Sequence, residues 1–193
     1  MTIRFLVRLA NKENLTPENI DAIAQKSDSL LKPYHASAGN IRVSKYAIEM
    51  DLFPPHVGDA AALVHHLEQE FGETLTLRQL DLLIPPPTSS RDVITLARGL
   101  FNDERFWETH EEVEALWKTK QGEEKELLQG FILVAVAFVH LQKNEVRICL
   151  SVLKRALKKL EVSIHLYEGL DVNMLRERVQ AILNSEIPVI FKV

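Results

Sequence analysis

The sequence predicts an α+β protein in which a small α/β sandwich, ferredoxin-like or a partial version of that fold, precedes an all-α antiparallel helical bundle. Residues 1–84 alternate between strand-like and helix-like patterns of apolar residues. A proline-rich stretch at residues 85–90 interrupts both patterns, and residues 91–193 carry helical periodicity alone. We therefore predict an N-terminal domain, a linker and a C-terminal bundle with these boundaries.

The first two elements are a strand and a helix. Every second residue is apolar from Ile3 to Leu9, as expected for a strand with one buried face. Thr16 and Pro17 then supply a cap residue and a proline at the first helical position, so a helix begins here. It ends near Pro33, because proline cannot continue a helix.

Residues 41–53 are strand-like, but their apolar phase changes partway. Ile41 and Val43 are odd positions, whereas Ile48 and Leu52 are even, and one straight strand cannot keep both sets on one face. A bulge or bend near Ser44 would restore the register. A tight hairpin would also restore it, although Ser-Lys is an unfavourable turn sequence.

The N-terminal domain then continues with a helix over residues 57–71, ended by Gly72, and a strand from Leu75 to Leu77. The element order is β-α-β-α-β. If the phase change is a hairpin, the order becomes β-α-β-β-α-β, which is ferredoxin-like.

Helices account for the rest of the chain. Ser89 and Asp92 resemble a capping box that starts the bundle. The helical patterns cover residues 91–101, 104–119, 123–143, 145–161 and 171–184. Their short connections predict antiparallel neighbours.

Composition limits the class of protein. Hydrophobic residues make up 46% of the chain and the net charge is −4, so the chain is globular and lacks the basic excess of a duplex-binding protein. A lone cysteine, Cys149, allows no intrachain disulfide and is expected to be a buried structural thiol. The most apolar segment, 130–141, is too short to span a bilayer. We expect a soluble cytoplasmic protein with no membrane partner, and a nucleic-acid partner is not expected.

The helix at 104–119 carries the main cluster of polar residues. Phe106, His110 and Trp117 form one stripe along it, together with Val113. Glu111 and Glu114 stand beside this stripe, and Glu114 is one turn from His110. The helix therefore presents an imidazole and two carboxylates between aromatic side chains.

The next helix adds Gln129 and His140, which share a face with Leu133 and Val136. Because this helix is almost wholly apolar, we expect it to be buried, and buried polar groups need hydrogen-bond partners. The polar side chains of the preceding helix can act as these hydrogen-bond partners. The predicted pocket consists of Phe106, His110, Glu111, Glu114, Trp117, Gln129 and His140.

Three roles fit this pocket. The first is a structural hydrogen-bonded network that fixes the helix register. The second is a divalent-metal site formed by His110, Glu111, Glu114 and His140, although the sequence has neither the paired Glu-x-x-His pattern of bundle di-metal proteins nor His-Glu-x-x-His. The third is acid–base catalysis by Glu111 or Glu114. Beyond a divalent metal, the sequence leaves the cofactor unknown.

Charges are segregated along the bundle. Residues 103–126 contain nine acids, and residues 143–161 contain six bases. Neighbouring solvated helix faces that attract each other would explain this pattern. Alternatively, the basic helix binds phosphate or an RNA backbone.

The segment from 98 to 184 resembles a family known as domain of unknown function 309. The resemblance rests on a Phe-Asn start, an aromatic-Glu-x-His-Glu-x-x-Glu-x-x-Trp core, a Gln-Gly pair and an apolar helix ending near a histidine. The matching residues are Phe101, Asn102, Phe106, Trp107, Glu108, His110, Glu111, Glu114, Trp117, Gln129, Gly130, Ala135, Ala137, His140, Leu150, Leu153, Ala156 and Leu160. The resemblance implies a helical bundle and no established activity, and it covers nothing of residues 1–90. Arg147 and Ile148 stand where the family often has Gly-Ala.

The sequence leaves the function open. We expect a small ligand-binding or interaction protein that uses the His/Glu/Gln pocket for an unidentified small molecule. One alternative is a metal-dependent hydrolase with the same residues, and another is a nucleic-acid-associated protein. A homodimer is compatible with a free sheet edge or an apolar surface.

Overall fold

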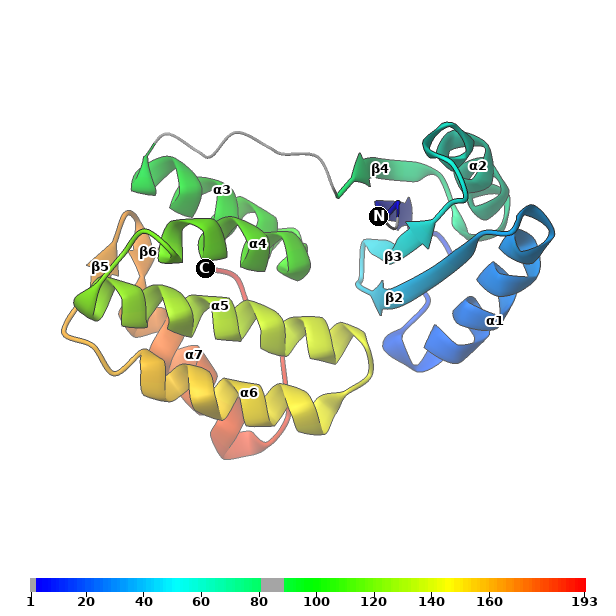
Figure 1. The fold of residues 1–193 in the computed structure, drawn as a ribbon. Helices are drawn as coiled ribbons and strands as arrows, with labels where there is room; N and C mark the ends of the chain where they lie inside the picture. Colours follow the sequence, from blue (N-terminus) through cyan, green and yellow to red (C-terminus); the bar gives the residue numbers. More distant parts are fainter. Residues whose placement is uncertain (1–2, 81–88) are drawn as a thin grey trace. The chain divides into compact units, whose positions relative to one another are not determined.

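The structure is a computed structural model that describes residues 3–80 and 89–193. The chain divides into two compact units, one formed mainly by residues 1–84 and the other mainly by residues 85–193 (Figure 1). Residues 85–88 of the predicted linker lie outside the described residues, while Ser89 and Ser90 belong to the start of the first bundle helix. Each unit has its own apolar core.

The first unit is a four-stranded antiparallel sheet with two helices. Its elements are β1 (Phe5–Ala10), α1 (Ile20–Leu31), β2 (Ser37–Val43), β3 (Ala47–Phe53), α2 (Ala60–Phe71) and β4 (Thr74–Gln79). The strand order is β2-β3-β1-β4, and every neighbouring pair is antiparallel. With the element order β-α-β-β-α-β, this is the ferredoxin-like arrangement, as one of the two sequence alternatives predicted.

One face of this sheet packs against the helices. Val7, Ile48 and Met50 are fully buried there with Leu67 of α2 and Leu31 of α1. Because side chains alternate along a strand, the residues between them point to the opposite face.

That opposite face is charged. Arg42 Nε lies 2.6 Å from Glu49 Oε1, Arg4 Nη2 lies 2.7 Å from Asp51 Oδ2, and Arg8 Nε lies 3.4 Å from Glu49 Oε2. Pairing lowers the cost of burying a charge, and these ion pairs connect three neighbouring strands.

The phase change within residues 41–53 is a hairpin, and the preference for a bulge near Ser44 was wrong. Ser44 N–H donates to Ala47 O at 2.9 Å, and Ser44 Oγ accepts from Ala47 N–H at 2.9 Å, which closes a two-residue turn at Lys45 and Tyr46. Asn11 donates to Ser44 O at 2.9 Å from the neighbouring loop. The serine side chain and this tertiary contact replace the asparagine and glycine of the common hairpin turns.

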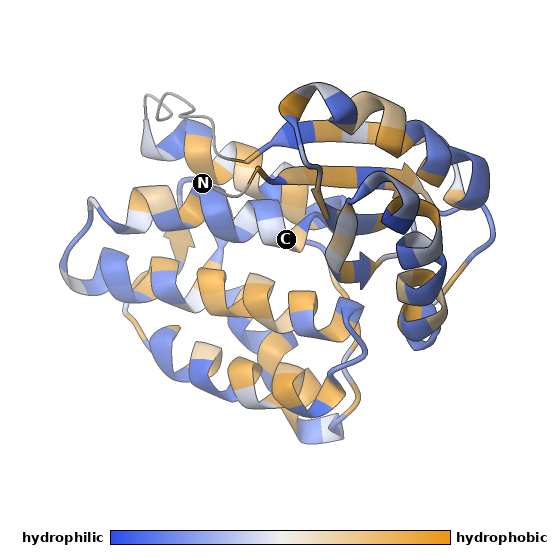
Figure 2. Ribbon diagram, turned by 45° about the vertical axis from the view of Figure 1, so that its right-hand side comes forward, coloured by the Kyte–Doolittle hydropathy of each residue, from blue (hydrophilic) through white to orange (hydrophobic). Residues whose placement is uncertain are grey.

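The second unit is the helical bundle. Its elements are α3 (Ser90–Asn102), α4 (Phe106–Trp117), α5 (Gly122–Gln142), α6 (Val146–Lys159), a short hairpin of β5 (Leu166–Tyr167) and β6 (Leu170–Asp171), and α7 (Val172–Ser185). In Figure 1, α5 lies between α4 and α6. Figure 2 shows that the bundle helices carry both hydrophobic and hydrophilic residues. The predicted helices are present, but the β5–β6 hairpin was not predicted. Ser89 Oγ accepts from Asp92 N–H at 3.2 Å, as the capping pattern indicated.

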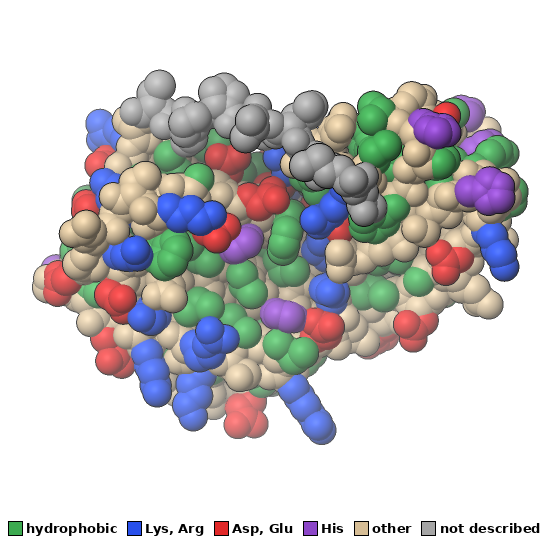
Figure 3. Space-filling model, viewed as in Figure 1, with side chains coloured by type: hydrophobic (Ala, Val, Ile, Leu, Met, Phe, Trp, Pro, Cys, Tyr) green, Lys and Arg blue, Asp and Glu red, His purple; other side chains and the backbone are tan. Residues whose placement is uncertain are grey.

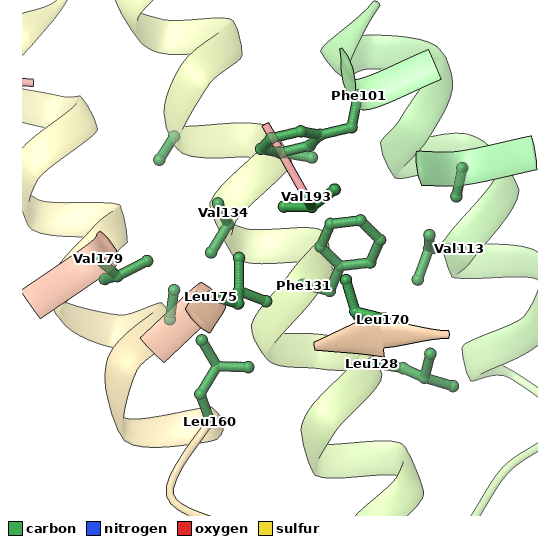
Figure 4. Packing of buried hydrophobic residues seen from close by; sticks show 14 of the residues in the cluster. Phe101, Val113, Leu128, Phe131, Val134, Leu160, Leu170, Leu175, Val179 and Val193 are labelled. Carbon is green, nitrogen blue, oxygen red and sulfur yellow. The ribbon is translucent and has the colours of Figure 1, made fainter. Parts of the chain in front are cut away.

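Aromatic rings fill the centre of the bundle. Phe101 lies 4.9 Å from Phe106, 5.6 Å from Phe131 and 5.8 Å from Phe138 between ring centroids. Figure 4 shows Phe101 and Phe131 among aliphatic residues from α5, α6 and α7. Such ring pairs stabilise a core beyond the area that they bury.

The C-terminal residues close this core. Phe191 lies 5.4 Å from Phe138 between ring centroids, and Val193 is 8% exposed. Asn102, at the end of α3, accepts from Val193 N–H at 2.8 Å and donates to Val193 O at 3.0 Å. We refer to this pair of bonds as the Asn102–Val193 clasp.

Gly130 sets the distance between α5 and α6. A Cβ at this position would lie 2.7 Å from two carbons of the Leu160 side chain and 3.3 Å from its backbone nitrogen. Leu160 is fully buried, so it has little room to move. The glycine is therefore required by helix packing rather than by a turn.

Among the described residues, no helix is both long enough and apolar enough to cross a lipid bilayer.

We expect Gly130→Ala to lower the free energy of unfolding by about 1–3 kcal/mol, because it overpacks a closed core. Gly99→Ala in α3 is the matched control, since a Cβ there meets nothing within 4 Å. The control should be neutral or stabilising by up to about 1 kcal/mol. Urea unfolding of both variants measures this, and equal effects would contradict the role given to Gly130.

Cys149 should be chemically inert in the folded protein. Its side chain is fully buried, and burial raises the pKa of its thiol to about 12, so the reactive thiolate is scarce at neutral pH. We expect a thiol reagent to label it no faster than the bundle opens. Labelling at pH 8 with and without urea measures this, and rapid reaction in buffer alone would refute it.

Candidate functional site

The start of α4 is held by its own side chains. Arg105 Nε and Nη2 each donate to one carboxylate oxygen of Glu108, both at 2.7 Å, and Thr109 Oγ1 donates to Arg105 O at 3.0 Å. A two-bond arginine–carboxylate pair fixes both position and orientation. The first turn of α4, which precedes His110, is therefore held in place.

His110 lies against an aromatic surface on the same helix. Its ring centroid is 5.2 Å from that of Trp107, at an interplanar angle of 45°. The side chain is half-buried, and His110 Nδ1 is buried with no hydrogen-bond partner among the described residues. A buried polar atom without a partner costs free energy.

The charge state of His110 follows from its surroundings. Burial lowers its pKa, because the imidazolium form loses hydration, while the carboxylates of Glu114 and Glu111 partly oppose this shift and Lys118 adds to it. The imidazole is therefore neutral at pH 7, and one ring nitrogen can accept a hydrogen bond.

Two neighbours of His110 already contact lysines. Lys118 Nζ lies 3.3 Å from Glu114 Oε1, and Lys125 Nζ lies 4.6 Å from the centroid of the Trp117 ring. The indole nitrogen of Trp117 is also buried without a hydrogen-bond partner among the described residues. The carboxylate and the indole ring thus attract cations, and flexible lysine side chains supply them.

Phe106 belongs to the core rather than to a pocket. It is fully buried and packs against Phe101 and Phe138, whose ring centroid is 5.1 Å away. His110, Glu111 and Glu114 lie within one turn of each other on α4, as the spacing predicted.

Gln129 and His140 do not meet at one point. They are 11 residues apart on α5, which places them about 16 Å apart along the helix axis. His140 Nδ1 instead lies 2.5 Å from Glu145 Oε2, across the turn into α6. His140 therefore stabilises the α5–α6 connection, and one compact ligand on α4 cannot contact both residues.

The face of α5 that carries Gln129 and His140 is also its least buried face. Gln129, Leu133, Val136 and His140 are all half-buried, whereas Phe131, Val134, Ala135 and Phe138 are fully buried. These polar groups are therefore not fully shielded from solvent. Their need for hydrogen-bond partners on α4 is weaker than the sequence indicated.

The four residues considered as metal ligands were His110, Glu111, Glu114 and His140. Within residues 3–80 and 89–193, no group of three or more His, Cys, Asp or Glu side chains is placed to hold a metal ion. The donor chemistry suits a cation, but the described side chains do not gather around one point.

Some organising residues were missed from the sequence. The predicted pocket did not include Trp107, although this residue contacts the His110 ring, and the Arg105–Glu108 pair was not predicted. The i, i+3 spacing of Arg105 and Glu108 was an available signal. The Asn102–Val193 clasp spans 91 positions, so no local pattern could reveal it.

Comparisons with known proteins place the bundle in a family. Residues 94–152, from α3 to α6, match the family model described as Domain of unknown function (DUF309). The chain belongs to this family. The DUF309 segment contains His110, Glu111, Glu114, Gln129 and His140.

One solved structure is similar to about half of the chain. It is a conserved hypothetical protein from Thermus thermophilus, 32% identical, and the match covers 47% of this chain and 95% of that one with a TM-score of 0.42. No curated protein matches. Membership of the DUF309 family therefore does not identify an activity for this chain.

We expect His110 to make stability depend on pH. Its folded-state pKa is depressed, so the unfolded chain binds a proton more readily near pH 6.5, and stability is present above that pH and lost as pH falls. The slope is at most about 1.4 kcal/mol per pH unit, the value for one proton. Urea unfolding between pH 8 and pH 5 measures it, and His110→Gln should reduce the slope. An unchanged slope would contradict this assignment.

Proposed function

We propose that the DUF309 bundle is a binding module for a small polar molecule, with His110 at the centre of its site. The observation that supports this most directly is the buried His110 Nδ1, which has no hydrogen-bond partner within the described residues. Natural proteins rarely leave such atoms unsatisfied, and a ligand that donates a hydrogen bond would supply the missing partner.

The surrounding groups define the ligand class. Glu111 and Glu114 are acceptors with negative charge, and Trp107 and Trp117 offer aromatic faces. A neutral imidazole beside them also accepts hydrogen bonds. A small cation with N–H donors satisfies all three kinds of group, and it would replace Lys118 at Glu114 or Lys125 at Trp117.

A metal-dependent hydrolase is not supported by the arrangement of side chains. His140 pairs with Glu145, and the described residues offer no cluster of three metal ligands. A cation with several donors can be recognised by groups spread along one helix face, whereas a metal ion needs its ligands at about 2.0–2.2 Å from one point.

Methylguanidinium chloride is a suitable probe, with tetramethylammonium chloride as a matched cation that has no N–H donor. We expect methylguanidinium to shift the His110 ring resonances saturably in an NMR titration, and tetramethylammonium to leave them unchanged at the same concentration. His110→Phe, followed through the indole resonance of the neighbouring Trp107, should weaken methylguanidinium binding about tenfold or more, which corresponds to one lost charged hydrogen bond.

His165→Phe serves as the control, because His165 is exposed and lies outside α4. It should leave the affinity unchanged. Urea unfolding of each variant checks that the bundle is folded. Equal shifts with both cations, or none with either, would refute the proposal.

A further inference from the structure

A groove runs between α6 and α7, away from the His110 site. Two adjoining hollows of about 540 and 470 Å³ form it, and both are lined by Leu157, Gln180 and Asn184. Because they share these residues, the hollows are one continuous feature along the two helices.

The floor of the groove is apolar. Leu150 and Leu157 lie seven residues apart on α6, and Leu183 of α7 faces the same hollow. All three are only half-buried. Leucines two turns apart on one face match the spacing with which a docked amphipathic helix presents its apolar residues.

A basic stripe of α6 borders the groove, and Lys154 of this stripe lines it. Arg147, Lys154 and Lys158 lie along the exposed side of α6 next to Leu150 and Leu157, and helix geometry places them on one stripe. In Figure 3, Lys and Arg side chains project along the edge of the bundle where Figure 1 places α6.

These cations are not neutralised within the bundle. Of the basic residues on α6, Lys159 pairs with Glu126 at 2.8 Å, on the side toward α5. Within the described part of the chain, Arg147, Lys154, Arg155 and Lys158 make no ion pair. Attraction between the acidic and basic helices therefore explains only a small part of the charge segregation.

Acidic residues bound the groove at its ends. Glu161 and Glu177 line one end, and Glu186 lines the other. The opposite wall, on α7, presents the amides of Gln180 and Asn184. The basic stripe of α6 extends over about 16 Å between these ends, the length of 11 helical residues from Arg147 to Lys158. Arg176 also lines the end that carries Glu161 and Glu177, where its Nη2 donates to Val162 O at 3.1 Å.

We infer that this groove docks an acidic amphipathic helix of a partner protein. The partner's apolar side chains would contact Leu150, Leu157 and Leu183, and its carboxylates would face Arg147, Lys154 and Lys158. Burial of the leucines supplies affinity, and the unpaired cations select an acidic partner.

A nucleic acid fits these features less well. It would be attracted by the cations, but none of the described residues that line the groove has an aromatic side chain on which bases could stack. A membrane surface would contact the cations but cannot enter a groove between two helices. Both serve as outcomes of the test.

The probe is a fluorescent 16-residue helical peptide with leucines at heptad spacing flanked by glutamates, compared with a peptide in which glutamine replaces each glutamate. Anisotropy titrations on the full chain are expected to show saturable binding of the acidic peptide and at least about tenfold weaker binding of the neutral one. A single-stranded oligonucleotide of equal charge and anionic vesicles are tested in parallel.

Three variants locate the site. Lys154→Gln with Lys158→Gln should weaken the acidic peptide about three- to tenfold, which is the expected effect of two exposed ion pairs. Leu157→Gln should weaken both peptides. Lys12→Gln with Lys32→Gln removes the same charge from the first unit and should change the affinity less than about twofold.

Tighter binding of the oligonucleotide or the vesicles would overturn the proposal, as would equal affinity for the two peptides or no binding of either. An equal loss in the control pair would show that net charge, rather than the groove, attracts the peptide. Because His110 lies elsewhere, His110→Phe should leave peptide binding intact, which separates this test from that of the cation site.

Discussion

The enclosure of α5 is the constraint on which the bundle depends. Phe131, Val134, Ala135 and Phe138 form one fully buried stripe along this helix, and Ala137 and Val139 are buried on either side of it, so neighbours must cover a wide arc of α5. Burial of large side chains dominates the free energy of folding. Three features help to cover α5: the aromatic cluster, the close approach of α6 at Gly130 and the packing of Phe191 against Phe138.

The same constraint explains where function can lie. A residue that faces α5 is committed to packing, as Phe106 and Cys149 are. Side chains that remain available to bind a ligand or a partner lie on the outward parts of α4 and on the exposed sides of α6 and α7. The His110 site and the α6–α7 groove are both of this kind, and each combines a partly buried apolar surface with charges at its margin.

Periodicity predicted the helices of the bundle well, because each helix buries a stripe of apolar residues that recur about every third or fourth position. It predicted the hairpin of residues 41–53 poorly. The turn depends on the Ser44 side chain and on Asn11, which is 33 positions away, and local turn preferences contain no information about such a contact. The candidate site was predicted in part for a similar reason. The spacing placed His110, Glu111 and Glu114 together. The expected convergence of Gln129 and His140 with them was wrong, because the pairing of His140 with Glu145 and the partial exposure of this face of α5 depend on tertiary packing.

The Asn102–Val193 clasp has a consequence for chain connectivity. It brings Val193 to the end of α3, the first helix of the bundle. The beginning of that helix is about 20 Å away, the length of 13 helical residues, and about six or seven extended residues would bridge it. The bundle is therefore suited to circular permutation, with Val193 joined to Ser89 by a short linker and new ends opened in the loop between α6 and α7.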